Sequence, residues 1–225
     1  MNNRAVLGIF AKQPLPGRVK TRLCPPLTPA QAARLYHCCL RETVRLAEQE
    51  DWCAWLFYQG QRQFFSRAFP DVHLAEQTGD HLGERLTQAF ASRFADGAQQ
   101  VVIIGSDSPD LPVSLIRQAF CALARHDVVL APATDGGYVL IGLRQPAPAL
   151  FTNIPWSTGE VLSATRRKLA ELQLKCQELP GWHDVDDVAS LRQLIRRSPA
   201  SATARLASQL LAGSMPAQLS TPTTR

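Results

Sequence analysis

The sequence predicts a single-domain α/β protein with a mostly parallel, open sheet that carries helices on both faces. Apolar runs of strand length alternate with helical patterns along residues 1–197, and this alternation is typical of a parallel sheet. Residues 101–104 read VVII, a continuous apolar run as in a central strand buried on both faces. The chain of 225 residues is long enough for one large core of this kind.

The first half of the chain predicts four strands and two helices. The residues Thr28-Pro29-Ala30-Gln31 have the pattern of a capping box with proline at the first helical position, so a helix is expected from there to about residue 48. Apolar residues at helical spacing predict a second, amphipathic helix over residues 82–94. The expected strands are residues 5–11, 52–58, 72–75 and 101–104.

The second half continues the same alternation. We expect helices over residues 111–125 and 188–197, strands at 128–131 and 138–143, and a further helix opened by a second capping-box pattern at 157–160. The domain is predicted to end at residue 197. Residues 198–225 are rich in Ser, Ala, Thr and Pro and predict a low-complexity tail, with a turn or two of helix in 202–211 and disorder in the last dozen residues.

The charge distribution does not favour a nucleic-acid partner. The formal net charge is +5, but five of the 24 basic residues lie in residues 189–225, where there is no acid. Residues 1–188 therefore carry 19 basic and 19 acidic residues. We find no face on which aromatic and basic residues interleave, so nucleic-acid binding is not expected.

Membrane, export and metal-framework signals are also missing from the sequence. No apolar run approaches the roughly 18 residues of a membrane span, and the N-terminal segment lacks the pattern of a signal peptide. A cytoplasmic location is the expectation that follows. The six cysteines form no C-x-x-C pair, which favours free thiols over a structural zinc site.

The loop after the first strand carries four basic residues. Residues 10–23 read FAKQPLPGRVKTRL, and the first acid of the chain is Glu42. Glycine lets a backbone approach a ligand, while N–H groups and cations neutralise phosphate oxygens. A solvated basic loop is the alternative. The predicted nucleotide- and phosphate-binding residues are Lys12, Gly17, Arg18, Lys20 and Arg22.

Carboxylates follow the central strand. Residues 101–112 read VVIIGSDSPDLP, which places Asp107 and Asp110 on a turn at the strand's end. Such a pair can hold a hard divalent cation that bridges diphosphate oxygens. The alternative is that Asp107 caps a turn and Asp110 caps the next helix.

The segment HDVDD at residues 183–187 offers a further carboxylate for the metal. Asp184 and Asp186 lie on one side of an extended segment. Asp186 is the predicted ligand, and Asp184 remains open. A helix N-cap at Asp186 or Asp187 is an equally good reading.

Two short motifs predict the substrate pocket. Residues 134–138 read TDGGY and follow the fifth strand, and residues 155–158 read PWST and precede a helix. We expect Asp135 to be catalytic, with Gly136, Gly137 and Trp156 lining the sugar or acceptor pocket. A hairpin turn and core packing of the indole are the alternatives.

Taken together, the motifs resemble one family of small bacterial nucleotide-diphospho-sugar transferases with a glycosyltransferase-A-like fold, some of them assigned to arsenosugar biosynthesis. The series FAKQPLPGRVKTRL, GDHLGERL, IGSDSPDLP, DGGYVLIGL, IPWST and HDVDD carries the resemblance over roughly residues 4–195. Residues 20–22 also look like the start of the phospholactate guanylyltransferases. The resemblance implies nucleotide near residues 10–22 and metal at Asp107. Members often continue the late Asp-x-Asp with Thr-Pro and an acid, whereas here Asp186 is followed by Asp187 and Val188.

These observations predict a transferase dependent on Mg²⁺ or Mn²⁺. Its donor is a nucleotide-diphospho-sugar, its acceptor is a small molecule, and Asp107 and Asp135 are the expected catalytic residues. One alternative is a guanylyltransferase-like enzyme that uses a nucleoside triphosphate and releases pyrophosphate. A second is a non-catalytic, nucleotide-binding regulatory module. The sequence names neither base, sugar, acceptor nor oligomeric state.

Overall fold

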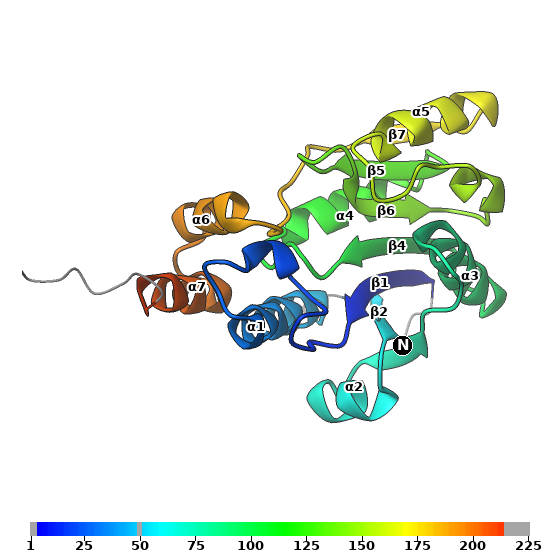
Figure 1. Ribbon diagram of the computed structural model, residues 1–225. Helices are drawn as coiled ribbons and strands as arrows, with labels where there is room; N and C mark the ends of the chain where they lie inside the picture. The colour runs from blue at the N-terminus through cyan, green and yellow to red at the C-terminus, as the bar shows by residue number, and fades with distance from the viewer. Residues whose placement is uncertain (1–3, 49–50, 214–225) are drawn as a thin grey trace, which may run out of the picture.

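A seven-stranded sheet in the order β3-β2-β1-β4-β6-β5-β7 forms the centre of the computed structural model, which describes residues 4–48 and 51–213 (Figure 1). Only β6 runs antiparallel to its neighbours β4 and β5, and the other pairs are parallel. The prediction of a mostly parallel sheet is therefore confirmed. The strands are β1 (Ala5–Lys12), β2 (Cys53–Gln59), β3 (His73–Glu76), β4 (Gln100–Gly105), β5 (Val128–Pro132), β6 (Tyr138–Leu143) and β7 (Cys176–Glu178).

Helices cover both faces of the sheet, as predicted. Successive side chains of a strand point to opposite faces, so Leu7 and Ile9 enter one core while Val6 enters the other. The first core also takes apolar side chains from α1, α2 and α4, and the second takes them from α3 and α5. The bounds are α1 (Pro29–Ala47), α2 (Arg62–Ala68), α3 (Leu82–Ala95), α4 (Val113–Ala122) and α5 (Val161–Glu171), with a 3₁₀ turn, η2 (Pro148–Phe151).

A third core lies beside α1, away from the sheet. It is closed by the 3₁₀ turn η1 (Thr21–Leu23) and by α6 (Val188–Arg197) and α7 (Ala202–Gly213) (Figure 1). The spacing of the buried residues Ala204, Ala207 and Leu210 gives α7 one apolar face. The Glu42 carboxylate accepts hydrogen bonds from the backbone N–H groups of Ala202 and Thr203 at 2.7 and 2.9 Å.

This helix corrects the predicted domain boundary at residue 197. The tail prediction of a turn or two of helix in residues 202–211 underestimated α7, because small and apolar residues at three-residue spacing bury a face against α1 and α6. Residues 214–225, for which disorder was predicted, lie outside the described residues.

Several local predictions can be compared with the structure. The capping box at Thr28 and Gln31 is present, and both of its hydrogen bonds form. The second predicted capping box is wrong, because α5 begins only at Val161 and its N-cap Glu160 makes no side-chain cap. The structure instead has a turn there, with Ser157 in the left-handed region at φ 66°. The short, polar elements α2 and β7 gave no recognisable pattern.

Two further findings concern the cysteines and the helices. All six cysteines are free thiols. Burial raises the pKa of the Cys39 thiol to about 12, which keeps it protonated and unreactive. Within residues 4–48 and 51–213, no helix is long and apolar enough to cross a bilayer.

Candidate active site

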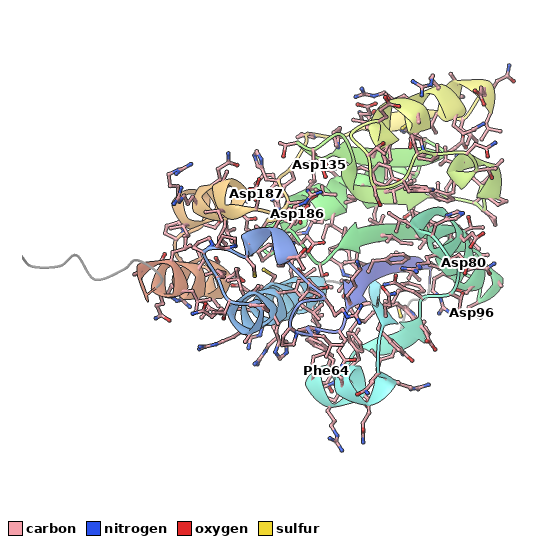
Figure 2. The ribbon with its side chains drawn as sticks, in the orientation of Figure 1. Phe64, Asp80, Asp96, Asp135, Asp186 and Asp187 are labelled. Carbon is pink, nitrogen blue, oxygen red and sulfur yellow. The ribbon has the colours of Figure 1, made fainter. Side chains whose placement is uncertain are left out.

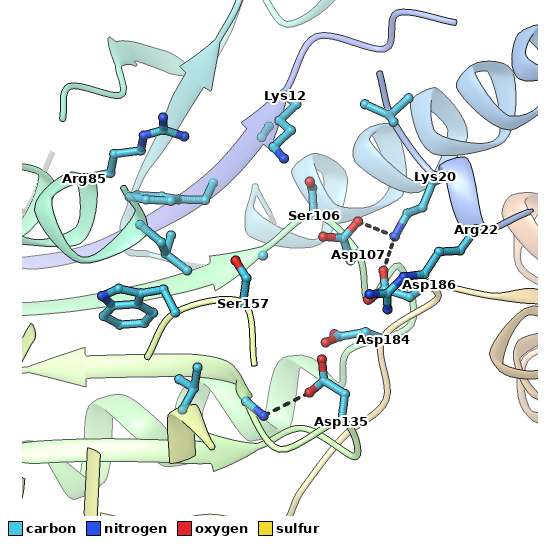
Figure 3. Close-up of a pocket in the computed structure, with 18 of the residues that line it drawn as sticks. Lys12, Lys20, Arg22, Arg85, Ser106, Asp107, Asp135, Ser157, Asp184 and Asp186 are labelled. Carbon is cyan, nitrogen blue, oxygen red and sulfur yellow. Dashed lines mark hydrogen bonds and ion pairs between the residues drawn. The ribbon is translucent and has the colours of Figure 1, made fainter. Parts of the chain in front are cut away.

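A cleft of about 960 Å³ opens at the carboxyl ends of β1 and β4. These two strands are neighbours in the centre of the sheet, and ligands of open α/β sheets bind where the strand order reverses. Figure 3 shows that charged side chains from distant segments meet here. The predicted residues that line the cleft are Lys12, Arg18, Lys20, Arg22, Asp107, Asp135, Gly137, Trp156 and Asp186.

A buried tyrosine joins the ends of the two central strands. The Tyr36 hydroxyl, on α1, accepts a 2.9 Å hydrogen bond from the backbone N–H of Lys12 and shares a 2.7 Å hydrogen bond with Ser106. Burial and the nearby negative charge of Asp107 raise the pKa of Tyr36, so the hydroxyl stays protonated. These bonds fix the start of the basic loop relative to the turn that carries Asp107.

Lys20 lies between two carboxylates at the centre of the site. Its ammonium nitrogen is 2.5 Å from Asp107 Oδ1 and 2.9 Å from Asp186 Oδ1 (Figure 3). Burial acts to lower the pKa of the ammonium, but the negative charges of Asp107 and Asp186 outweigh it and raise the pKa above its ordinary value. The side chain is therefore a cation, and it joins the turn after β4 to the segment before α6.

Asp184 is a third carboxylate, largely buried, that lies beside Asp107 and Asp186. Its Oδ1 accepts a 2.7 Å hydrogen bond from the Ser108 hydroxyl, and the next residue, Val185, donates its backbone N–H to the carbonyl oxygen of Asp107 at 2.9 Å. Burial, together with the charges of Asp107 and Asp186, raises the pKa of the Asp184 carboxyl to about 6. The segment 184–186 is thus bonded directly to the turn that presents Asp107.

Asp135 lies at the same end of the sheet as Asp186 (Figures 2 and 3). Its Oδ1 accepts a 3.0 Å hydrogen bond from the backbone N–H of Gly137, which holds the carboxylate on the turn between β5 and β6. Gly136 has φ 91°, and a Cβ there would lie 2.1 Å from the carbonyl oxygen of Gly159. Only glycine allows this contact, which brings the Asp135 turn against the loop before α5.

The other end of the cleft is lined by Trp156 and by residues at the start of α3. A Cβ on Gly83 would lie 2.5 Å from the indole nitrogen of Trp156, so the glycine is what allows helix and indole to pack this closely. Arg85 also lines the cleft. Its guanidinium donates to the carbonyl oxygen of Gly79 at 2.9 Å, at the side of Figure 3 opposite Lys20.

The structure does not bring Asp110 into this group, which corrects its prediction as a metal ligand. Asp110 is absent from the cleft lining, and its side chain is only 7% exposed. Arg197 contacts both carboxylate oxygens, at 2.6 and 3.0 Å, and the Ser198 hydroxyl donates at 2.7 Å. It is not a helix cap either, because the N-cap of α4 is Pro112. Asp110 therefore anchors the end of α6.

Three other predictions are refined. Gly17 has φ 73° at the tip of the basic loop and does not line the cleft, and Gly136 supports the cleft from behind its lining. In the segment 183–187, the helix-cap role and the cleft role fall to two adjacent aspartates. Asp187 forms the N-cap of α6, with its Oδ1 accepting from the backbone N–H of Ser190 at 2.8 Å, while Asp186 faces Lys20 in the cleft.

The carboxylates around Lys20 are of a chemical type that binds hard cations. The ammonium of Lys20, however, occupies the position between Asp107 and Asp186. Asp107, Asp184 and Asp186 supply oxygen atoms, the ligands that Mg²⁺ and Mn²⁺ prefer. Within the described ranges, no three His, Cys, Asp or Glu side chains are grouped closely enough to hold a metal ion. The carboxylates are therefore of the right chemical type for a divalent ion, but their arrangement around Lys20 is not a formed metal site.

Sequence reasoning missed several residues that line the cleft or support it from behind. Tyr36 lies in a regular helical pattern of buried residues, so nothing distinguishes it from core. Ser108 sits between Asp107 and Asp110, and its polar role depends on Asp184 arriving from a remote segment. The GDHLGER motif was visible, yet its position beside the cleft depends on how α3 packs.

Comparison with protein-family models gives one match. Residues 42–158 match the family described as "Uncharacterized protein conserved in bacteria (DUF2064)". None of the curated proteins matches the chain significantly.

Solved structures give a close relative and several distant ones. A protein from Desulfovibrio desulfuricans G20, whose assignment as a nucleotide-diphospho-sugar transferase is provisional, is 33% identical, with a TM-score of 0.89 over 95% of this chain and 97% of that one. CMP:2-keto-3-deoxy-manno-octonic acid synthetase, solved with CTP, is 13% identical, with a TM-score of 0.55 over 92% of this chain and 100% of that one.

A third structural match is Rv0371c from Mycobacterium tuberculosis H37Rv, solved with manganese. It is 17% identical, with a TM-score of 0.51 over 85% of this chain and 98% of that one. At such identities the likeness of the synthetase and of Rv0371c concerns the fold alone. The chain thus shares its fold with a provisionally assigned nucleotide-diphospho-sugar transferase and with a synthetase solved with CTP.

Proposed function

Because the chain belongs to the bacterial family DUF2064, and is similar over nearly its whole length to a provisionally assigned nucleotide-diphospho-sugar transferase, we propose that it is a metal-dependent transferase. Its donor is a nucleotide-diphospho-sugar, and it glycosylates a small acceptor with the help of Mg²⁺ or Mn²⁺. The observation that carries this proposal is that Lys20 pairs with Asp107 and Asp186 in one cleft. Three further cationic side chains of the same segment line that cleft, namely Lys12, Arg18 and Arg22.

The basic side of the cleft is the proposed phosphate site. Lys12, Arg18 and Arg22 line it together with Lys20, and cations are the groups that bind diphosphate oxygens. The pairing of Tyr36 with the backbone N–H of Lys12 holds the start of this loop in place. Prealigned cations stabilise the charge that develops on a departing nucleoside diphosphate.

The proposed metal ligands are Asp107 and Asp186, with Asp184 behind them. A divalent ion there neutralises diphosphate oxygens when bound. The role of the protein is to hold the two carboxylates at one place, which the bond from the Val185 N–H to the Asp107 carbonyl does. Asp135 faces the same space from the opposite loop, and we assign it the acceptor side, with Trp156 as a wall of the sugar pocket.

Nucleotidyl transfer is the second candidate. Four cations in and beside one loop suit a triphosphate, and one distant structural relative is a synthetase solved with CTP. Nucleotidyl transfer breaks the bond at the α-phosphorus and releases pyrophosphate, whereas sugar transfer breaks the glycosidic carbon–oxygen bond and releases a nucleoside diphosphate. The cleft beyond Asp135, with its Gly137 and Trp156 walls, favours sugar transfer because it leaves room next to the metal site.

Product analysis separates the candidates. The protein is incubated with Mg²⁺ and either a panel of sugar nucleotides or a panel of nucleoside triphosphates, each with a broad set of small acceptors. Release of nucleoside diphosphate from a sugar nucleotide supports the proposal. Pyrophosphate from a triphosphate, without turnover of any sugar nucleotide, overturns it in favour of nucleotidyl transfer. Tight nucleotide binding without turnover of either panel indicates a regulatory module.

A matched pair of variants tests the metal ligands. Asp186→Asn and Asp187→Asn change neighbouring residues, but only Asp186 faces Lys20, while Asp187 caps α6. Asparagine is also a good N-cap, so Asp187→Asn should keep the Mg²⁺-dependent part of nucleoside diphosphate binding in calorimetry. Asp186→Asn and Asp107→Asn should lose most of it. Equal metal-dependent affinity in all three variants removes these carboxylates from the proposal.

A further inference from the structure

We propose that Lys20 keeps a divalent cation out of the Asp107–Asp186 carboxylate pair until the phosphates of a bound nucleotide draw its ammonium away. The inference rests on the proposed function for the identity of the metal and of the phosphate ligand. It adds an order of binding, in which nucleotide comes first and metal second. The residue predicted as a phosphate ligand would thus also control access to the metal site.

The geometry places the ammonium where a bridging cation belongs. One nitrogen lies 2.5 Å from Asp107 Oδ1 and 2.9 Å from Asp186 Oδ1, so the two carboxylates are close enough to share a single cation. Oxygen ligands of Mg²⁺ lie roughly 2.1 Å from the ion. A metal using the same two oxygen atoms therefore has no space while the Lys20 nitrogen remains between them.

The Lys20 side chain is much more buried than the two carboxylates with which it pairs. The Lys20 side chain is 5% exposed, whereas those of Asp107 and Asp186 are 42% and 44% exposed. The carboxylates are open to the cleft, but the single positive charge of Lys20 already offsets one of their two negative charges from the protein side. Without that cation, two like charges would face each other across a few ångströms, an arrangement that attracts a divalent ion.

Nucleotide phosphates offer Lys20 another partner within the same cleft. Lys20 itself lines the cleft next to Arg18 and Arg22, so phosphate bound to those arginines lies near its ammonium. The backbone of Lys20 is left-handed, with φ 49° and ψ 39°, at the start of the short turn η1. Such a conformation is disfavoured for a residue other than glycine, and the two ion pairs help to hold it. Exchanging them for phosphate frees Asp107 and Asp186 together.

The test is a titration of Mn²⁺ into the protein without nucleotide, followed by the paramagnetic resonance signal of the free ion. Wild type should bind Mn²⁺ weakly, and Lys20→Met should bind it at least tenfold more tightly. The matched control is Lys168→Met, which removes a cation that pairs with Glu171 outside the cleft and should change the affinity about twofold at most. Adding Asp107→Asn to Lys20→Met should abolish the gain.

The outcomes distinguish this inference from the proposed function. Lys20→Gln, which retains a polar side chain, guards against a folding defect in Lys20→Met, and thermal melts check both. Equal or weaker Mn²⁺ binding by both variants overturns the inference, even where calorimetry shows that wild type binds nucleoside diphosphate more tightly with Mn²⁺. A gain in both variants, in a protein whose wild type binds no nucleotide, keeps the role of Lys20 and removes the donor.

Discussion

Asp110 and Asp107 are three residues apart on one turn, and their neighbours give them different tasks. Asp107 faces Lys20 in the cleft, whereas Asp110 is held by Arg197 and Ser198. The hydrogen bonds from Arg197 and Ser198 outweigh burial and lower the pKa of the Asp110 carboxyl. The same residue type in the same motif thus anchors a helix in one position and lines the candidate active site in the other.

We expect Asp110→Asn to destabilise the protein by about 1.5–3 kcal/mol, the range for hydrogen bonds to charged groups. Denaturant unfolding measures this free energy. The matched control is Glu171→Gln, which removes an exposed ion pair with Lys168 and should cost less than about 0.5 kcal/mol. Unfolding of Asp110→Asn at the same denaturant concentration as wild type would show that the anchor contributes nothing.

The contribution of Asp110 should also depend on pH. A carboxyl whose pKa is lower in the folded state than its ordinary 3.8 stabilises the fold when it is ionised in both states. That stability is fully present above the ordinary pKa and is lost as the pH falls through the lower, folded value. The difference in unfolding free energy between wild type and Asp110→Asn should therefore stay constant from pH 7 to about 5 and shrink below 3.8. A difference that grows in acid contradicts the assignment.

At the scale of elements, the contact between two loops depends on one glycine. Gly136, at φ 91°, carries the turn between β5 and β6 against Gly159, in the loop before α5. Gly136→Ala adds strain and a clash with backbone at 2.1 Å, and should cost about 2–4 kcal/mol in urea unfolding. Gly137→Ala is the control, because its Cβ meets only the side chain of Asp135, at 3.3 Å. It should cost about 1 kcal/mol or less. Similar losses in both variants would mean that the loop contact is not decisive.

On the scale of the whole molecule, the fold was more predictable than the site. The alternation of apolar runs with periodic helices gave β1, β4, α1 and α6 within a few residues, because each has a strong local pattern. The three residues of β7 form a strand only because β5 lies beside them. Helix α7 was underestimated because a composition of small residues gives no sign of the α1 surface that it covers.

The candidate active site was also predictable only in part. Lys20 and Asp107 could be placed in one cleft because motifs at the carboxyl ends of strands share an edge of the sheet. The fate of Asp110 could not be predicted, since its partner Arg197 lies 87 positions away. Nor could the position of Lys20 between two acids, which depends on the backbone of a loop rather than on spacing.

The gathering of cations at one cleft should make binding depend on salt. Lys12, Arg18 and Arg22 line the cleft near the proposed phosphate site, and exposed charges are screened as ionic strength rises. We expect the dissociation constant of a nucleoside diphosphate to rise at least about fivefold between 0.05 and 0.5 M NaCl. The corresponding nucleoside, which carries no phosphate, should bind with little change, and calorimetry compares the two. An unchanged diphosphate affinity would mean that the cations do not bind phosphate.

The pairing of Lys20 with Asp186 spans 166 positions of the chain, and this distance has a consequence for synthesis. During synthesis, Lys20 and Asp107 are made well before Asp186. Until Asp186 is added, Lys20 can pair with only one of its two carboxylate partners. Strands β1 and β4 can pair at that stage, but the cation-binding geometry cannot exist. Ligands of this cleft can therefore protect only a chain that has been made past Asp186, and folding up to that point depends on the sheet and its helices alone.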